Sequence, residues 1–342
     1  MSLTNDPKIV VQIPCFNEEA TIQATVSDIQ AALASLPNVV TLVIDDGSTD
    51  RTVDAARRAG VDWVARIPQN GGLARAFITG LNASVRLGAD IIVNTDADNQ
   101  YCADDITKLI QPIVAGRCGM VIGARPIAEI EHFPWYKKLL QRVGTATVRW
   151  LSGSQLIDAT SGFRAFSREV ALRLNVFTPF TYTLETIIQA GRSGITIESV
   201  PVRVNPPTRS SRLFRSIPQY ILRATLSMLK VYTIYEPLRT YLILGLVPFT
   251  AALALCIRYI LLITLSDPTR SHAPSLILAA VLFVLSFLLW AIGVLAELVA
   301  TNRRLLEDIQ NEQRRARLRS GNPLSLDDNF ELSNLKRPGS AT

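Results

Sequence analysis

Two carboxylates stand one residue apart in the segment VNTDADNQY, residues 93–101. Asp96 and Asp98 follow the short, largely apolar and β-branched run Ala89–Thr95, which is typical of a strand covered on both faces. In extended backbone the side chains at i and i+2 point to the same side, so the two carboxylates project together and repel each other. A divalent cation between them would relieve that repulsion. A polar turn is the other interpretation, because Asp and Asn are common turn residues.

Further carboxylates and amides follow other expected strands. They are Asn17, Glu18 and Glu19 after Lys8–Ile13, Asp45 and Asp46 after Val39–Ile44, Asn70 after Val61–Ile67, and Gln100 beside Asp98. The carboxyl ends of parallel strands meet at one edge of a sheet, where α/β proteins bind ligands. Carboxylate and amide oxygens suit a hard cation such as Mg²⁺ or Mn²⁺ rather than zinc. The set predicts a nucleoside diphosphate bound through a metal ion.

The segments between these loops alternate between strand and helix patterns. Helices are expected over 19–36, 72–87 and 104–115, and a further strand over 119–123. Such alternation favours an α/β fold with a mainly parallel sheet covered on both faces. The first strand leads into PCFNEE, with no Gly-x-Gly-x-x-Gly, and no Walker-type motif occurs in the chain, so a dinucleotide fold of the usual kind is not indicated.

Five stretches in this order resemble a known family. IPCFNEE, VIDDGSTD, NGGLARAFITGL, NTDADNQY and DATSGFRAFSR are similar to the consecutive motifs of family 2 glycosyltransferases with the GT-A fold. The likeness is greatest to the dolichol-phosphate mannose synthases and polyprenyl-phosphate glycosyltransferases, and it covers about residues 8 to 230. It implies a GT-A, Rossmann-like domain and an inverting, metal-dependent transferase. The implied donor is a UDP- or GDP-linked sugar, the metal Mg²⁺ or Mn²⁺, and the acceptor a polyprenyl phosphate.

The resemblance also implies roles for individual residues. The nucleotide sugar is assigned to Pro14, Asn17, Glu19, Asp46, Asn70 and Asp96, and the metal to Asp96, Asp98 and Gln100. Catalytic roles fall to Asp98, Arg125 and Asp158, and binding of the acceptor phosphate to Ser161, Arg164, Arg209, Ser211 and Arg212. The segment NPPTRSSRLFRS departs from the family pattern Arg-x-x-Gly-x-Ser-Lys-Leu, because the glycine is absent and Arg212 replaces the lysine. Membrane-surface charge is the other interpretation of these arginines.

A phosphate acceptor agrees with the scarcity of general bases. The chain has two histidines, His132 and His272, and the second lies in an expected external loop. A sugar hydroxyl needs a base to remove its proton, whereas a phosphate monoester is already anionic near pH 7, since its second pKa is about 6. Asp158 and Glu185 remain candidate bases, and Asp158 is also a candidate for orienting an arginine.

Two apolar runs follow the family-like region. Tyr241–Leu265 and Ser275–Ala300 are each long enough to cross a bilayer core of about 30 Å. Basic residues flank both runs: Arg209, Arg212, Arg215, Arg223, Lys230 and Arg239 before the first, and Arg303, Arg304, Arg314, Arg315, Arg317 and Arg319 after the second. The positive-inside rule then predicts an integral protein of the cytoplasmic membrane with the catalytic domain and both termini in the cytosol. The net charge of +6 is interpreted as membrane-surface charge, with no nucleic-acid partner.

The expected organisation has four parts. They are a catalytic domain over 1–208, juxtamembrane amphipathic helices over 209–240, two transmembrane helices over 241–300, and a charged helix with a disordered tail over 301–342. Trp135–Leu151 and Ile217–Tyr235 mix aromatic, apolar and basic residues, as helices in a membrane interface do. The resemblance also implies a homo-oligomer, such as the tetramers of similar proteins.

Two other functions are weighed. Transfer to a sugar hydroxyl, as in polysaccharide or glycolipid synthesis, predicts a Gln-x-x-Arg-Trp acceptor motif that the chain lacks. A membrane scaffold without turnover predicts loss of the metal carboxylates, yet Asp96, Asp98 and Gln100 are all present.

Overall fold

The structure, a computed structural model, describes residues 6–34, 36–126, 135–174, 176, 182–206, 226, 229–230, 232–265, 273–319 and 330–335. The chain divides into two compact units. The sheet unit comprises Met1–Ser211 with Asn311–Thr342, and the helical unit comprises Arg212–Gln310.

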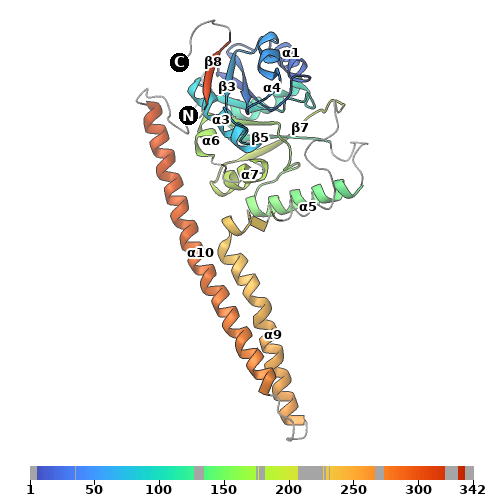
Figure 1. Ribbon diagram of the computed structural model, residues 1–342, viewed down its shortest axis with the longest axis vertical. Coiled ribbons are helices and arrows are strands. Elements are labelled where there is room, and N and C mark those ends of the chain that lie inside the picture. Colours follow the sequence, from blue (N-terminus) through green and yellow to red (C-terminus); the bar gives the residue numbers. More distant parts are fainter. Residues whose placement is uncertain are drawn as a thin grey trace. The chain divides into compact units, whose positions relative to one another are not determined.

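The sheet unit is built on an eight-stranded sheet in the order β7-β5-β6-β4-β1-β2-β3-β8 (Figure 1). The strands are β1 (Ile9–Cys15), β2 (Val39–Asp45), β3 (Trp63–Arg66), β4 (Ile91–Asn94), β5 (Met120–Ala124), β6 (Arg164–Ser167), β7 (Ile197–Pro201) and β8 (Glu331–Asn334). Strands β6 and β8 run antiparallel to their neighbours and the other pairs are parallel. The sheet is therefore mixed, with β6 inserted between β4 and β5.

Helices cover both faces of this sheet. Helices α1 (Ile22–Leu33), α2 (Thr52–Arg58) and α4 (Ile106–Val114) pack on one face, where alternate strand residues such as Val11 and Val93 form the core. Helices α3 (Leu73–Arg86), α6 (Arg168–Arg173) and α7 (Tyr182–Arg192) pack on the other face. Because side chains alternate along a strand, neighbours such as Gln12 and Asn94 turn toward this second layer. The strands and helices expected between residues 8 and 123 are confirmed, with their ends shifted by a few residues.

The described tail contributes to the same sheet. Strand β8 pairs antiparallel with β3, with Leu332 opposite Ala65, and the ring of Phe330 lies 4.9 Å from the Arg86 guanidinium carbon. The expectation of a disordered tail is therefore wrong for Glu331–Asn334. A sequence of four residues with three polar side chains does not stand out as a strand, and its pairing depends on a partner more than 260 residues earlier in the chain.

Helix α5 (Trp135–Ser152) is one of the two expected interface helices. The C-terminal end of α5 packs against α7, with Ser152 next to Gly191. The side chain of Trp150, near the same end, is 64% exposed. The second expected interface helix, Ile217–Tyr235, lies largely outside the described residues, and its role at the membrane stays a prediction.

The helical unit holds α9 (Pro237–Leu265) and most of α10 (Ala273–Arg319). The two helices are long and apolar enough to cross a membrane, over Pro237–Thr264 and Pro274–Gln310. They pack together through Trp290, which lies against Gly245 and donates a hydrogen bond to the carbonyl of Leu242. Its ring centroid lies 5.3 Å from that of Phe249, and the two rings are tilted by 38°. Most of their other apolar side chains are exposed, as expected of helices whose surroundings are lipid.

Candidate active site

The loops after β1 and β2 are held together by hydrogen bonds. Asn17, whose φ of 55° is left-handed, accepts a bond from the Thr49 amide through Oδ1 at 2.9 Å. Glu19 accepts one from the Arg51 amide through Oε2 at 3.2 Å. Pro14 is buried within β1 opposite Ile44. The structure thus brings Asn17 and Glu19 together at one edge, as predicted, and gives both a part in joining the two loops.

Asp46 connects these loops to the start of α3. Its carboxylate accepts hydrogen bonds from the amides of Gly71 at 2.9 Å and Gly72 at 2.8 Å. Burial raises the pKa of Asp46 above its ordinary value, although the two amides oppose that rise. Asn70, in the same loop, is exposed. Asp46 thus holds the loop that carries Asn70, so these two predicted nucleotide-binding residues lie close together.

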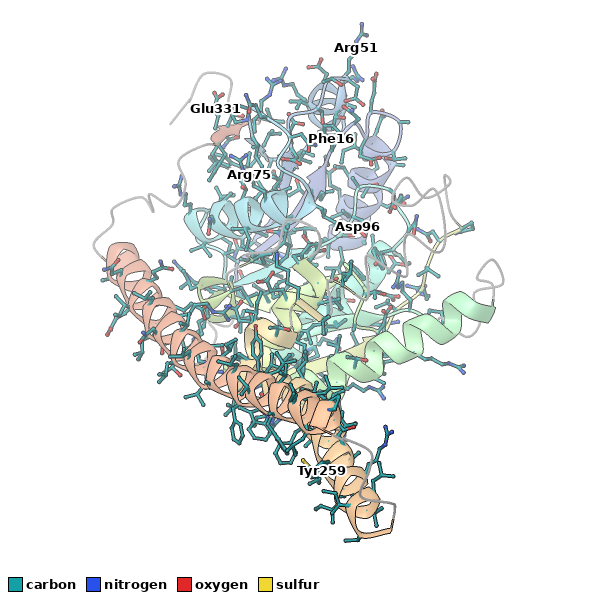
Figure 2. All side chains as sticks on the ribbon, turned by 60° about the horizontal axis from the view of Figure 1, so that its bottom comes forward. Phe16, Arg51, Arg75, Asp96, Tyr259 and Glu331 are labelled. Atoms are coloured by element: carbon teal, nitrogen blue, oxygen red, sulfur yellow. The ribbon has the colours of Figure 1, made fainter. Side chains whose placement is uncertain are left out.

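Asp96 and Asp98 follow β4, and both are half-buried. Figure 2 labels Asp96 among the side chains of the sheet unit. Burial, together with the charge of Asp98, raises the pKa of Asp96 to about 7, although the charges of Arg125 and Arg164 act in the opposite direction. Asp98 accepts a hydrogen bond from the amide of Gln100 at 3.2 Å. The two carboxylates are thus near enough to repel, as expected from the sequence.

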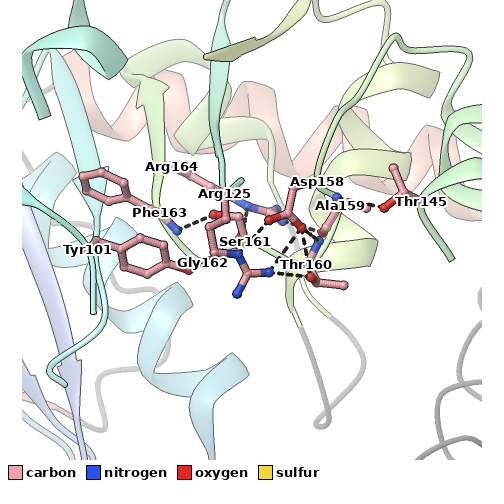
Figure 3. A network of polar contacts seen from close by, with 10 residues as sticks. All are labelled: Tyr101, Arg125, Thr145, Asp158, Ala159, Thr160, Ser161, Gly162, Phe163 and Arg164. Atoms are coloured by element: carbon pink, nitrogen blue, oxygen red, sulfur yellow. Dashed lines mark hydrogen bonds and ion pairs between the residues drawn. The ribbon is translucent and has the colours of Figure 1, made fainter. Parts of the chain in front are cut away.

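A second pair of charges lies beside them. Arg125 follows β5 and binds Asp158 through two bonds, from Nε to Oδ2 at 2.7 Å and from Nη2 to Oδ1 at 3.2 Å (Figure 3). Arg125 also donates from Nη2 to the Thr160 hydroxyl at 2.7 Å. The Asp158 side chain is fully buried and that of Arg125 is 18% exposed. Of the two roles considered for Asp158, orienting an arginine is the one that these contacts support.

The expected acceptor-phosphate residues are placed differently. Ser161 and Arg164 are both 0% exposed, and Arg164 donates hydrogen bonds to main-chain carbonyls of its own loop and of α7. Glu185 is also buried, within α7. Arg209, Ser211 and Arg212 lie outside the described residues. Phosphate binding by this set stays a prediction.

Asn205, the first residue of the segment NPPTRSSRLFRS, supports the loop after β4 that carries Asp96 and Asp98, a role that the sequence analysis did not assign to it. Asn205 donates from its amide to the carbonyl of Gln100 at 2.8 Å and from Nδ2 to the carbonyl of Asn99 at 3.0 Å. Nearby, the buried Asp105 accepts bonds from the main chain and side chain of Arg203. A second missed group, Gln12 and Asn94, is polar inside otherwise apolar strands. That contrast is a signal that could have identified them.

The donor set suits a divalent cation. Asp96 and Asp98 offer hard oxygen ligands, and a cation would relieve the repulsion that raises the pKa of Asp96. Among the described residues no group of three or more His, Cys, Asp or Glu side chains gathers in a metal-binding arrangement. Two carboxylates with an amide leave positions for the oxygens of a diphosphate, which is how Mg²⁺ is often held.

Sequence comparison identifies relatives of the sheet unit. The family model described as glycosyl transferase family 2 matches residues 10–174. The chain is 30% identical over 220 residues to a UDP-N-acetylglucosamine–dolichyl-phosphate N-acetylglucosaminyltransferase of Methanococcus voltae, covering 58% of this chain and 86% of the relative. It is 27% identical to the polyprenol monophosphomannose synthase of Mycolicibacterium smegmatis, covering 57% and 76%.

The fold has relatives among solved structures. A glucosyl-3-phosphoglycerate synthase from Mycobacterium tuberculosis, crystallised with Mn²⁺, UDP-glucose and phosphoglyceric acid, matches with a TM-score of 0.51 and 22% identity. The match covers 65% of this chain and 79% of that one. The ordered loops, the mixed sheet and these relatives together lead to one conclusion. The chain belongs to glycosyltransferase family 2 and has the GT-A fold.

Proposed function

We propose that this protein transfers a sugar from a nucleotide sugar to polyprenyl phosphate at the cytoplasmic face of a membrane. The observation that carries the proposal is the convergence of Asp96, Asp98 and Arg125 at the ends of β4 and β5. Two relatives support the acceptor, since their names specify dolichyl-phosphate and polyprenol monophosphate chemistry. The sugar and the base, UDP or GDP, are left open.

Different residues of the chain bind different parts of the donor. The loops joined by Asn17, Glu19 and Asp46 form the nucleoside side of the site, with Pro14 in the strand below and Asn70 exposed beside them. Asp96, Asp98 and Gln100 would hold Mg²⁺ or Mn²⁺. The bound ion would neutralise charge on the departing nucleoside diphosphate. Arg125, held by Asp158, places a further positive charge beside those carboxylates.

The reaction is a displacement at the anomeric carbon of the donor sugar. An oxygen of the lipid phosphate forms the new bond to that carbon, while the bond to the nucleoside diphosphate breaks and that group leaves with its electron pair. Attack from the opposite face inverts the anomeric configuration. The acceptor loses no proton, because a monophosphate is largely ionised near pH 7, with a second pKa of about 6. The buried state of Asp158 and Glu185 suits a reaction without a general base.

Chain connectivity supports the placement at the membrane. Strand β8 belongs to the same sheet as β1–β7, and two candidate spans lie between them in the chain. An even number of crossings returns the tail to the side of the sheet unit. The flanking arginines favour the cytosol for that side. The four-part division 1–208, 209–240, 241–300 and 301–342, and the homo-oligomer, are retained as parts of this proposal.

The test uses full-length protein in lipid nanodiscs with undecaprenyl phosphate, Mn²⁺ or Mg²⁺, and a panel of labelled UDP- and GDP-sugars. One donor is expected to give a lipid-linked sugar, with loss of product in EDTA and recovery on adding Mn²⁺. Asp98→Asn should lower the rate by at least about 100-fold, a usual cost of losing one transition-state charge contact. Asp54→Asn, in an exposed ion pair with Arg57, is the matched control. Transfer only to sugar hydroxyls, or full activity of Asp98→Asn, would overturn the proposal.

A further inference from the structure

A row of buried polar side chains crosses three adjacent strands of the sheet, next to the loop after β4 that carries Asp96 and Asp98. Gln12 on β1 lies opposite Asn94 on β4, and Asn94 lies opposite Arg164 on β6. All three are 0% exposed. Polar groups buried in the middle of a sheet destabilise the fold unless they are hydrogen-bonded. The hydrogen-bond partners of these three side chains therefore show which segments the row holds in place.

Asn94 is the centre of the row. Its Oδ1 accepts a hydrogen bond from Gln12 Nε2 at 2.8 Å. Its Nδ2 donates to the carbonyl of Gly162 at 2.8 Å and to the hydroxyl of Tyr182 at 3.0 Å. The Tyr182 ring is itself stacked on Phe77, with centroids 3.9 Å apart. Asn94 thus fixes the main chain at Gly162 from the side of the sheet.

Arg164 fixes the same segment from the other end. It donates hydrogen bonds to two carbonyls of the loop and to two acceptors in α7: Ser161 O at 2.7 Å, Ala159 O at 2.9 Å, Thr183 O at 2.8 Å and Thr186 Oγ1 at 2.8 Å. A guanidinium presents five N–H donors in a rigid plane, whereas a lysine ammonium has three at a single nitrogen. In addition, the Gly162 amide donates to the Tyr101 hydroxyl at 3.1 Å. Gly162 is therefore held at its carbonyl by Asn94 and at its amide by Tyr101. Figure 3 shows Gly162 between Tyr101 and Arg164.

Gly162 lies directly against Asp96. A methyl group placed on Gly162 would be 3.0 Å from both carboxylate oxygens of Asp96 and 3.1 Å from the Tyr182 hydroxyl. The backbone there is not left-handed, so it does not itself require glycine. The absent side chain is needed because the carboxylate occupies the space.

We propose that Gly162 is a positioning residue, held by Asn94 and Arg164, that sets the carboxylate of Asp96 for a divalent cation. The inference rests on the proposed function, because Asp96 is a metal ligand only within it. The buried segment Ser161–Arg164 then serves the metal side of the site. It acts on Asp96 through the position of its main chain.

The first experiment measures Mn²⁺ affinity of the full-length protein in detergent by electron paramagnetic resonance, with saturating UDP and, separately, GDP. Gly162→Ala should bind Mn²⁺ about tenfold or more weakly, as is usual when a group that orients a metal ligand is changed. Gly119→Ala is the matched control. Its methyl group would crowd Val170 at 2.7 Å and Ile195 at 3.1 Å, at the start of β5 and away from the carboxylates. Its Mn²⁺ affinity should equal that of the wild type.

The second experiment needs neither metal nor activity. Thermal unfolding is compared for wild type, Gly162→Ala, Asp96→Ala and the double variant. If the added methyl acts on the Asp96 carboxylate, the loss of Tm caused by Gly162→Ala should shrink by at least about 2 °C in the Asp96→Ala background. A Gly162→Ala protein that folds only together with Asp96→Ala gives the same answer.

The outcomes separate the two proposals. Wild-type Mn²⁺ affinity in folded Gly162→Ala overturns the inference, as does an unchanged Tm loss in the Asp96→Ala background or a double variant that fails to fold. A wild-type protein that binds no Mn²⁺ with either nucleotide contradicts the proposed function instead, and the thermal cycle still tests the Gly162–Asp96 contact.

Discussion

Arg125 and Asp158 form a buried ion pair with two parallel hydrogen bonds, 2.7 Å and 3.2 Å long. Burial alone would raise the pKa of Asp158, but the charge and hydrogen bonds of Arg125, with those of Thr160, outweigh it and hold the pKa below its ordinary value. Asp158 is therefore ionised at neutral pH and fixes the direction of the guanidinium. The paired arginine influences Asp96 directly, since its charge lowers the pKa of that carboxyl.

Replacing Asp158 by asparagine should lower kcat, although the two side chains have nearly the same shape. The neutral amide of Asp158→Asn cannot carry the charge or accept both bonds, so Arg125 is free to turn. A misplacement of about 1 Å commonly lowers the rate about 100-fold. Removing one partner of a buried pair costs about 3–5 kcal/mol, so a lower Tm is also expected. The measurements are kcat on nucleotide sugar and thermal unfolding.

Glu198→Gln supplies the comparison for that variant. It breaks the Arg117–Glu198 pair, whose side chains are 58% and 34% exposed, and exposed pairs contribute about 1 kcal/mol or less. Its kcat and Tm should stay near wild type. An Asp158→Asn protein with kcat within twofold of wild type would show that the orientation of Arg125 is unimportant.

Gly47→Ala should weaken donor binding. Gly47 has φ +71° and its added methyl would lie 2.8 Å from the Asn70 amide nitrogen, so the loop bonded to Asp46 must move. Gly116→Ala has nearly the same backbone, φ +68°, with nothing within 4 Å of the methyl. Both variants carry the left-handed strain of about 1–2 kcal/mol. Only Gly47→Ala is expected to raise KM for the nucleotide sugar. Equal KM values for the two variants would refute a role of the Asp46-bonded loop in donor binding.

Acid should destabilise the fold partly through Asp105. Burial opposes its ionisation, but hydrogen bonds from Arg203 and Lys108 lower its pKa below the ordinary value. A carboxyl with a lowered folded pKa contributes stability above its unfolded pKa of about 3.9, and that contribution is lost as pH falls through the folded value. Asp105→Asn should thus lower Tm at pH 7, with the difference from wild type narrowing below about pH 4.

The comparison for this pH series is Asp54→Asn, which removes an exposed carboxylate. Its Tm should follow the wild-type curve at every pH. A constant gap between wild type and Asp105→Asn from pH 7 to the acid limit of folding would mean that the Asp105–Arg203 pair does not supply the pH-dependent stability.

Removing the tail strand should destabilise the sheet unit. Deletion of residues 330–342 takes away β8 and the Phe330–Arg86 contact. The free edge of β3 then presents unpaired amides and carbonyls, which promote association between copies. We expect a lower Tm and higher-mass species in size-exclusion chromatography. Deletion of 336–342 alone keeps β8 and should behave as the full chain; identical behaviour of the two deletions would show that β8 adds no stability.

The sequence by itself determined the chemistry of the strand-end loops and the fold class. Asp96 and Asp98 follow an apolar strand, and their spacing places both carboxylates on one side of extended backbone. The order of the motifs and the two apolar runs then indicated the family and the candidate spans. Each motif and each apolar run is local, because it can be recognised from residues that are consecutive in the chain.

Tertiary structure alone decided which polar residues lie at the strand-end loops and which are buried beneath them. The sequence predicts that both Arg125 and Arg164 contact substrate groups. In the structure Arg125 follows β5 beside the carboxylates, whereas Arg164 is buried and donates to main-chain carbonyls. The row Gln12–Asn94–Arg164 exists because β6 inserts beside β4 and β1. Strand β8 likewise needs the distant edge of β3. Strand order and register depend on pairing between segments far apart in the chain, which local spacing does not specify.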